Sequence, residues 1–166
     1  MKSRRGFTLI ELMCVLFLIG LISTWFLPKI TSFRTLEVNA FGRELYQDIL
    51  EVKMLNITDD YIKMRIDTDH YQIASSFGEE IKRKQIDDRF VIVDNIGTHS
   101  GIIIISFNQY GHPNYAGTMY IYDRKREAIC CISIMPYTGK ISFYRENSIE
   151  KSQIIYIKEK ISDDLK

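Results

Sequence analysis

Three residues near the amino end carry the most distinctive chemistry of this 166-residue chain: Gly6, Phe7 and Glu11. Glu11 is the one charged residue between Phe7 and Leu27. A carboxylate inside an apolar segment of membrane length costs about 2.5–3.5 kcal/mol on insertion scales, so a cationic partner is expected. Cleavage between Gly6 and Phe7 would supply one, because the new amine of Phe7 lies four residues before Glu11. This spacing favours a proteolytic step followed by charge pairing, within one subunit or between neighbouring subunits.

The segment of residues 7–27 has the length and apolarity of a membrane-spanning helix. At about 1.5 Å per residue it would extend for roughly 30 Å, the thickness of the hydrocarbon core. Lys2, Arg4 and Arg5 precede it, which predicts a cytoplasmic amino terminus and an extracytoplasmic carboxyl-terminal domain. A secretory signal peptide fits less well, because its apolar region is usually shorter, about 7–15 residues, and ends at small residues. A plain signal anchor explains the length but leaves Glu11 unexplained.

The residues Gly6-Phe7-Thr8-Leu9-Ile10-Glu11-Leu12 resemble the cleavage and methylation motif of type IV pilins and pseudopilins. The resemblance implies that residues 1–6 are a leader removed by a prepilin peptidase, that Phe7 is N-methylated, and that Glu11 directs assembly into a filament. It implies as partners the peptidase, the major and other minor pseudopilins, the membrane and, indirectly, an assembly ATPase and its platform protein. The chain would then lie in the cell membrane and reach the cell surface when assembled.

A second helix is expected after the apolar segment. Apolar residues recur at spacings of three and four: Val38, Phe41, Leu45, Ile49 and Val52. This pattern predicts an amphipathic helix over residues 28–58. Gly42 interrupts the pattern, at a cost of about 1 kcal/mol relative to Ala. Pro28 either kinks the helix, as in many pilins, or is simply a helix-disrupting residue at the membrane edge. One long, bent helix from Phe7 onward is the simplest interpretation.

The part of the chain over residues 59–146 is rich in short strand patterns. They are bounded by turn residues and alternate or are continuously apolar. The predicted strands cover residues 61–66, 70–74, 89–94, 102–108, 118–123, 128–135 and 140–144. Short connections predict antiparallel pairing, so the expected fold is α+β and pilin-like, with the long amino-terminal helix packed on one carboxyl-terminal antiparallel sheet. The tail, residues 147–166, is compatible with an edge strand or a helix.

A second motif follows the apolar strand at residues 102–105. Its residues are Phe107, Asn108, Gly111, His112, Pro113, Asn114 and Gly117, together with Gly139 in a later hairpin turn. The glycines permit positive φ, and Pro113 restricts its predecessor. We interpret His112 as a loop residue held by backbone turns. The block resembles the carboxyl-terminal signature of H-type minor pseudopilins (the GspH/FimT group), most of all the competence pseudopilins of Gram-positive bacteria (the ComGD group).

This second resemblance implies a minor subunit of a DNA-uptake pseudopilus that helps transforming DNA to cross the cell envelope. The alternatives are a minor pilin or pseudopilin of a type II secretion or type IV pilus system, and a DNA-binding subunit at the pilus tip. Direct DNA contact would have to be local, because 22 basic and 21 acidic residues leave a net charge of only +1. The candidate contacts are two basic runs on expected turns: Lys82, Arg83, Lys84, Arg124, Lys125 and Arg126.

The remaining chemistry-bearing residues form no recognisable enzyme site. His70 and His99 lack the partner spacing of a zinc site, and the Asp67–Asp69 stretch departs from a calcium loop where a third ligand and a glycine should stand. No nucleophile elbow, phosphate loop or dinucleotide-binding pattern is present, so we expect neither catalysis nor a metal or cofactor. Cys130 and Cys131 adjoin on a predicted strand, one expected in the core and the other at the periphery.

Overall fold

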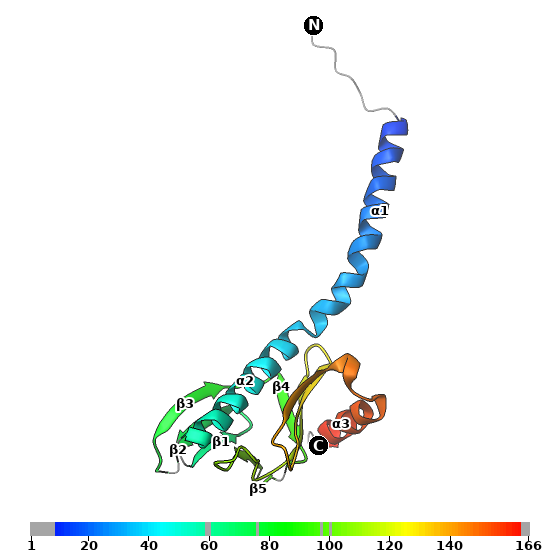
Figure 1. Cartoon of the computed structure of the whole chain (residues 1–166). Helices are drawn as coiled ribbons and strands as arrows, with labels where there is room; N and C mark the ends of the chain where they lie inside the picture. Colours follow the sequence, from blue (N-terminus) through cyan, green and yellow to red (C-terminus); the bar gives the residue numbers. More distant parts are fainter. Residues whose placement is uncertain (1–8, 59–60, 76, 97, 100, 164–166) are drawn as a thin grey trace. The chain divides into compact units, whose positions relative to one another are not determined.

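The computed structural model describes residues 9–58, 61–75, 77–96, 98–99 and 101–163. The chain divides into two compact units, residues 1–34 and 35–166 (Figure 1). The first contains helix α1 (Leu9–Arg34). Among its described residues, the second contains helix α2 (Leu36–Thr58), nine strands, a 3₁₀ turn (Glu146–Ser148) and helix α3 (Lys151–Asp163).

In its first fourteen residues, Leu9 to Ile22, helix α1 exposes apolar side chains. Between Leu9 and Ile22 the large apolar residues are all exposed. No helix within the described residues meets the length and apolarity that crossing a membrane requires. The membrane span expected over residues 7–27 therefore stays a prediction.

The expected single helix from Phe7 onward is wrong in one respect. The helix passes through Pro28 and ends at Arg34, so this proline does not terminate it. Thr35 then forms a turn, and α2 begins at Leu36 with the amide of Asn39 donating to the carbonyl of Thr35. Two successive helices thus replace one.

The strands form two antiparallel sheets, where the sequence predicted one. The first sheet has the order β3-β2-β1-β6-β5 and the second β4-β7-β8-β9. The first consists of β1 (Ile62–Ile66), β2 (His70–Ser75), β3 (Glu80–Gln85), β5 (Thr98–His99) and β6 (Ile102–Ser106). The second consists of β4 (Phe90–Asp94), β7 (Gly117–Asp123), β8 (Ala128–Ile134) and β9 (Ile141–Arg145).

All seven predicted strands are present, with boundaries shifted by one or two residues, but two further strands escaped prediction. Strand β3 has the sequence Glu-Ile-Lys-Arg-Lys-Gln, which lacks the apolar alternation of a half-buried strand. Its register is nevertheless fixed by pairing with β2, where Gln72 faces Arg83 and Ile73 faces Lys82. Strand β5 has two residues, too few to produce a pattern.

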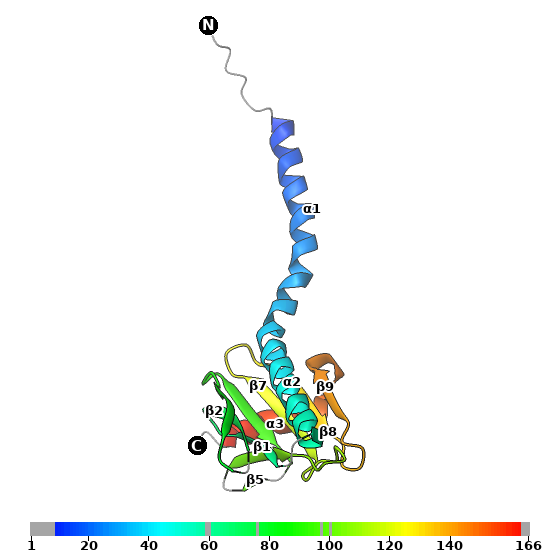
Figure 2. The same cartoon turned by 60° about the vertical axis from the view of Figure 1, so that its left-hand side comes forward.

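Helix α2 packs against both sheets and forms the main core (Figure 2). The predicted apolar stripe is confirmed, because Val38, Leu45, Ile49 and Val52 are fully buried. The ring of Phe41 in the same stripe stacks on Phe90 of β4, with centroids 4.7 Å apart. A hydrophobic stripe on one helix therefore holds the two sheets together.

Gly42 lies at a close contact between α2 and strands β8 and β9. A Cβ at this position would be 2.5 Å from the Sγ of Cys130 and 2.9 Å from a ring carbon of Phe143. The thiol of Cys130 in turn donates to the carbonyl of Val38 at 3.3 Å. The glycine is a requirement of helix–sheet packing and not only a local weakness of the helix.

The tail of the chain forms helix α3, which covers the other face of the second sheet. Ile157 and Ile161 pack there with Ile129, Cys131 and Val93 in a second apolar cluster. From the sequence, residues 147–166 could form an edge strand or a helix. In the structure this segment forms helix α3. Cys131 is consequently buried, so its predicted peripheral position is wrong; the prediction that Cys130 and Cys131 face opposite sides is confirmed.

Replacing Gly42 with Ala should destabilise residues 35–166, the unit that contains this entire core, by about 1–2 kcal/mol. Overpacking of about 1–3 kcal/mol outweighs the roughly 1 kcal/mol gained in helix propensity. Urea unfolding measures the effect. Cys130→Ala removes the Sγ that the new methyl group meets, so the double variant should lose less stability than the sum of the single variants. Strictly additive losses would contradict this packing.

Ending the chain after Glu150 should uncover Cys131 but leave Cys130 protected. Burial raises the pKa of Cys131 to about 11 and that of Cys130 to about 12, so both thiols stay protonated near neutral pH. In residues 35–166, which lack Cys14, loss of α3 should speed the alkylation of Cys131 by about tenfold or more. Mass spectrometry of the two modified peptides gives the rates. Equal acceleration at both cysteines would mean that the sheet itself unfolds.

Candidate functional site

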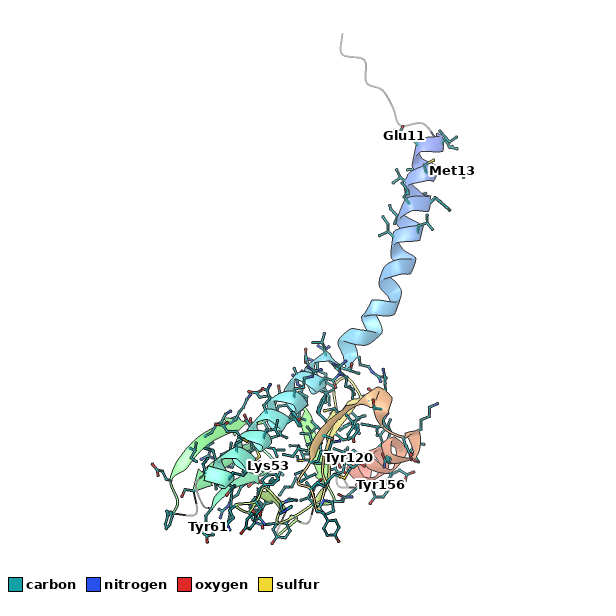
Figure 3. The ribbon with its side chains drawn as sticks, in the orientation of Figure 1. Glu11, Met13, Lys53, Tyr61, Tyr120 and Tyr156 are labelled. Carbon is teal, nitrogen blue, oxygen red and sulfur yellow. The ribbon has the colours of Figure 1, made fainter. Side chains whose placement is uncertain are left out.

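The residues of the amino-terminal motif fall partly outside the described structure. Gly6 and Phe7, the predicted cleavage and methylation residues, lie outside the described residues. Glu11 lies in the first turn of α1, where a carboxylate interacts favourably with the helix dipole (Figure 3). Its neighbours Ile10, Leu12 and Met13 are exposed, so the charge is set in an apolar helix surface.

The second motif forms a tight loop between β6 and β7. The Oδ1 atom of Asn108 accepts hydrogen bonds from the amides of Tyr110 at 3.0 Å and His112 at 2.9 Å. The Asn108 amide donates to the carbonyl of His112 at 2.8 Å, and Gly111 adopts φ of +76°. The side chain of His112 is exposed while its backbone is held on both sides, as the sequence predicted.

The second half of the loop is fixed to the end of β6 and to the segment before β5. Pro113 pairs with Phe107 in an isolated bridge, and the side-chain amide of Asn114 donates to the Ser106 hydroxyl at 2.8 Å. A Cβ at Gly117 would meet the Oδ1 atom of Asn95 at 2.6 Å, the same atom that accepts a hydrogen bond from Thr118. Gly117 thus permits a close approach between two segments.

Gly139 in the β8–β9 turn lies directly against this loop. It adopts φ of +59°, and a Cβ there would overlap the carbonyl oxygen of Gly111. Lys53, near the carboxyl end of α2, donates to the carbonyl of Gly139 at 2.8 Å and lies 5.9 Å from the ring centroid of Phe107. The motif residues therefore form one structural unit in which α2, the loop and the turn meet.

The first basic run lies on strand β3 and not on a turn, so its predicted location is wrong. Lys82 pairs with Asp48 at 2.7 Å, and Lys84 pairs with Glu44, both acids of α2. Asp48 is buried and also accepts a hydrogen bond from the Tyr71 hydroxyl at 2.6 Å. The hydrogen bond to Asp48 raises the pKa of Lys82, which keeps the ammonium charged. Burial, followed by the bond to Asp48, raises the pKa of Tyr71.

The second basic run lies on the β7–β8 turn, as predicted. Arg126 pairs with Glu37 of α2, and Arg89 binds the other oxygen of the same carboxylate. Arg124 and Lys125 are exposed on the turn, as Arg83 is on β3. Three of the six candidate DNA contacts are thus engaged with acids of α2, and the exposed three come from two separate elements.

The acidic residues of α2 are the partners that sequence reasoning missed. Glu44 and Asp48 are four residues apart and share one side of the helix, while Lys82 and Lys84 are two apart and share one side of a strand. That matching periodicity was visible in the sequence. It became meaningful only once β3 was known to be a strand beside α2.

The one group of possible metal ligands within the described residues lies at the β1–β2 hairpin: Asp67, Asp69 and His70. Each has a structural task there. Asp67 accepts a hydrogen bond from the amide of Thr68 at 2.7 Å, and Asp69 contacts the Nδ1 atom of His70 at 2.6 Å. The hydrogen bond from His70 lowers the pKa of Asp69. This arrangement is that of a polar hairpin turn.

Comparison with known proteins identifies the amino-terminal segment. Residues 1–27 match the prokaryotic N-terminal methylation motif. No curated protein and no solved structure matches the chain. The methylation motif is of the type IV prepilin kind; it supports a pilin-like protein, implies processing by a prepilin peptidase and assembly with other pilins, and suggests a membrane-anchored amino terminus.

Lys82→Met should lower the free energy of unfolding of residues 35–166 by about 1–2 kcal/mol, because the buried carboxylate of Asp48 would lose its cation. Lys125→Met removes the same charge from the exposed turn and should leave stability within about 0.5 kcal/mol of the parent. Thermal or urea unfolding compares the two variants. Equal stability of both would show that the Lys82–Asp48 pair contributes nothing to the fold.

Proposed function

We propose that this protein is a minor pseudopilin, a non-enzymatic subunit of a pseudopilus that takes up DNA. The observation that carries the proposal is Glu11 in the first turn of an all-round apolar helix, directly within the matched methylation motif. A helix that is apolar on all sides is stable only when lipid or other helices surround it. Such a helix is stored in the bilayer and later packs among neighbouring subunits.

Glu11 would set the axial position of each subunit in the filament. After cleavage, the amine of Phe7 in one subunit and the carboxylate of Glu11 in its neighbour neutralise each other. In an apolar environment this pairing is favoured strongly over a mismatched register, because an isolated charge there is costly. Because this pairing needs the free amine of Phe7, cleavage would have to precede assembly.

The globular unit supports a structural role in the pseudopilus. Its motif residues Asn108, Gly111 and Gly139 hydrogen-bond or pack against one another, which is the behaviour of a scaffold and not of a reacting centre. Its resemblance to competence pseudopilins favours DNA uptake over type II secretion or a type IV pilus. No catalytic group and no cofactor take part in this proposal.

A DNA-binding tip subunit is the less favoured alternative. Lys82, Lys84 and Arg126 are engaged with acids of α2, which removes half of the candidate phosphate contacts. Binding through the rest would depend on Arg83, Arg124 and Lys125 and would weaken steeply with salt. We therefore favour an indirect role in DNA transport.

Two substitutions separate processing from assembly. Gly6→Ala should block cleavage, so that mass spectrometry finds a chain still beginning at Met1. Glu11→Ala should be cleaved normally but fail to enter filaments, measured by cysteine cross-linking to the major pseudopilin in sheared fractions; Glu11→Asp should retain partial incorporation. Normal processing and incorporation of both variants would contradict the proposal. Loss of transformation with secretion intact, after deletion of the gene, would support DNA uptake over the other systems.

A further inference from the structure

A pocket that the proposed function does not use lies at the carboxyl end of α2. It has a volume of about 340 Å³. Its lining comes from the last turns of α2, the residue before β1 and the loop after β6: Asn56, Tyr61, Phe107, Asn108, Gln109, Tyr110 and Asn114. We propose that this pocket binds a neutral sugar unit of a glycan.

The lining combines aromatic rings with side-chain amides. Tyr110 is 75% exposed and Tyr61 63%, so both side chains present surface to solvent. Within the described residues, the Nδ2 atom of Asn108, the Oδ1 atom of Asn114 and both amide atoms of Gln109 make no hydrogen bond. A sugar has C–H faces that stack on tyrosine rings, and hydroxyl groups that both donate to and accept from amides.

The residues that line the pocket carry no charge, which favours a neutral sugar over a nucleic acid as the ligand. None of the lining residues is charged, and from Asn95 to Tyr122 the sequence contains no Lys, Arg, Asp or Glu. The ammonium of Lys53 nearby is engaged with the carbonyl of Gly139. Along the chain, the two residues before Tyr61 are Asp59 and Asp60. Nucleic-acid binding takes its affinity from cations at the phosphates, and the residues that line this pocket supply none.

The scaffold holds the pocket in one conformation. Tyr61 has φ of +79°, a left-handed conformation that is unfavourable for a tyrosine. The residue is held between α2 and β1 by the side-chain amide of Asn56. The Nδ2 atom of Asn56 donates to the Ile62 carbonyl at 2.7 Å, and its Oδ1 atom accepts from the Ile62 backbone amide at 2.9 Å. The hydrogen-bonded Asn108 loop also contributes to the lining. Backbone strain retained beside a concave site is typical of ligand binding.

The shape of the site favours a small unit over a protein surface. Tyrosine- and asparagine-rich loops also occur in protein-binding surfaces, where they form broad, nearly flat contacts. Here the same residue types line a concavity within the size range of small-molecule pockets, about 300–1,000 Å³. One sugar ring, or two, would fill it.

The experiment uses the full-length protein in a detergent without a sugar headgroup. The probes are cellotetraose, maltotetraose and the tetramer of N-acetylglucosamine, with binding measured by saturation-transfer NMR and calorimetry. We expect at least one probe to bind. Tyr110→Ala should weaken binding by about tenfold or more, and Tyr110→Phe should preserve it because the ring remains.

Tyr61→Gly distinguishes a ligand site from a structural residue. Glycine adopts φ of +79° without strain, so the variant should keep or raise the melting temperature while losing sugar binding. Tyr156→Ala is the matched control, because Tyr156 on α3 is also 63% exposed and is not part of this pocket (Figure 3). It should bind the probes like the parent.

Three results would overturn the proposal. The first is no binding of any probe to the parent protein, and the second is equal loss of binding in Tyr156→Ala. The third is that the protein binds an oligothymidylate but none of the sugars, and that Tyr110→Ala abolishes this binding. That result would mean that the tyrosine rings stack on nucleic-acid bases. Because binding is measured on purified protein, failure here leaves the role in filament assembly unaffected.

Discussion

The burial of one face of α2 is the interaction on which the globular unit depends. Val38, Leu45, Ile49 and Val52 are withdrawn from water by strands of two different sheets. The two sheets are separate, and strands of both contact this helix. This packing also constrains single residues: Gly42 must lack a side chain so that the Sγ of Cys130 can approach the helix. Removing the helix would expose the inner surfaces of both sheets together.

The polar face of the same helix organises the charges around it. Glu37, Glu44 and Asp48 engage arginines and lysines from β3, from the β7–β8 turn and from the residue before β4. The two basic runs look in the sequence like a nucleic-acid-binding surface, but three of their six residues form ion pairs with acids of α2. A helix that is apolar on one face and acidic on the other therefore determines both the core and the electrostatic surface of the unit.

Two parts of the molecule, the amino-terminal motif and the pocket beside α2, place chemistry in contrasting environments. Near the amino end, Glu11 is one carboxylate among exposed apolar side chains. In the proposed function, cleavage between Gly6 and Phe7 supplies an amine that pairs with a Glu11 carboxylate. At the carboxyl end of α2, the motif loop and Tyr61 line an uncharged pocket that contains two tyrosines. The first arrangement suits assembly between copies of related subunits, and the second suits recognition of a small neutral group. Each follows from the local balance of apolar surface, charge and hydrogen-bonding capacity.

The sequence alone determined the methylation motif, the amphipathic stripe of α2, seven strands and the turn geometry around Gly111 and Gly139, because each depends on spacing or on the conformational range of a few neighbouring residues. Tertiary structure decided what depends on contacts between distant segments. It made β3 a strand, since the lysines on one of its faces are matched by acids on α2. It divided the strands into two sheets, placed α3 over Cys131, and brought Tyr61 and Tyr110 to the lining of one pocket. Strand partners and helix docking depend on complementary surfaces that meet only after folding, so no local pattern specifies them.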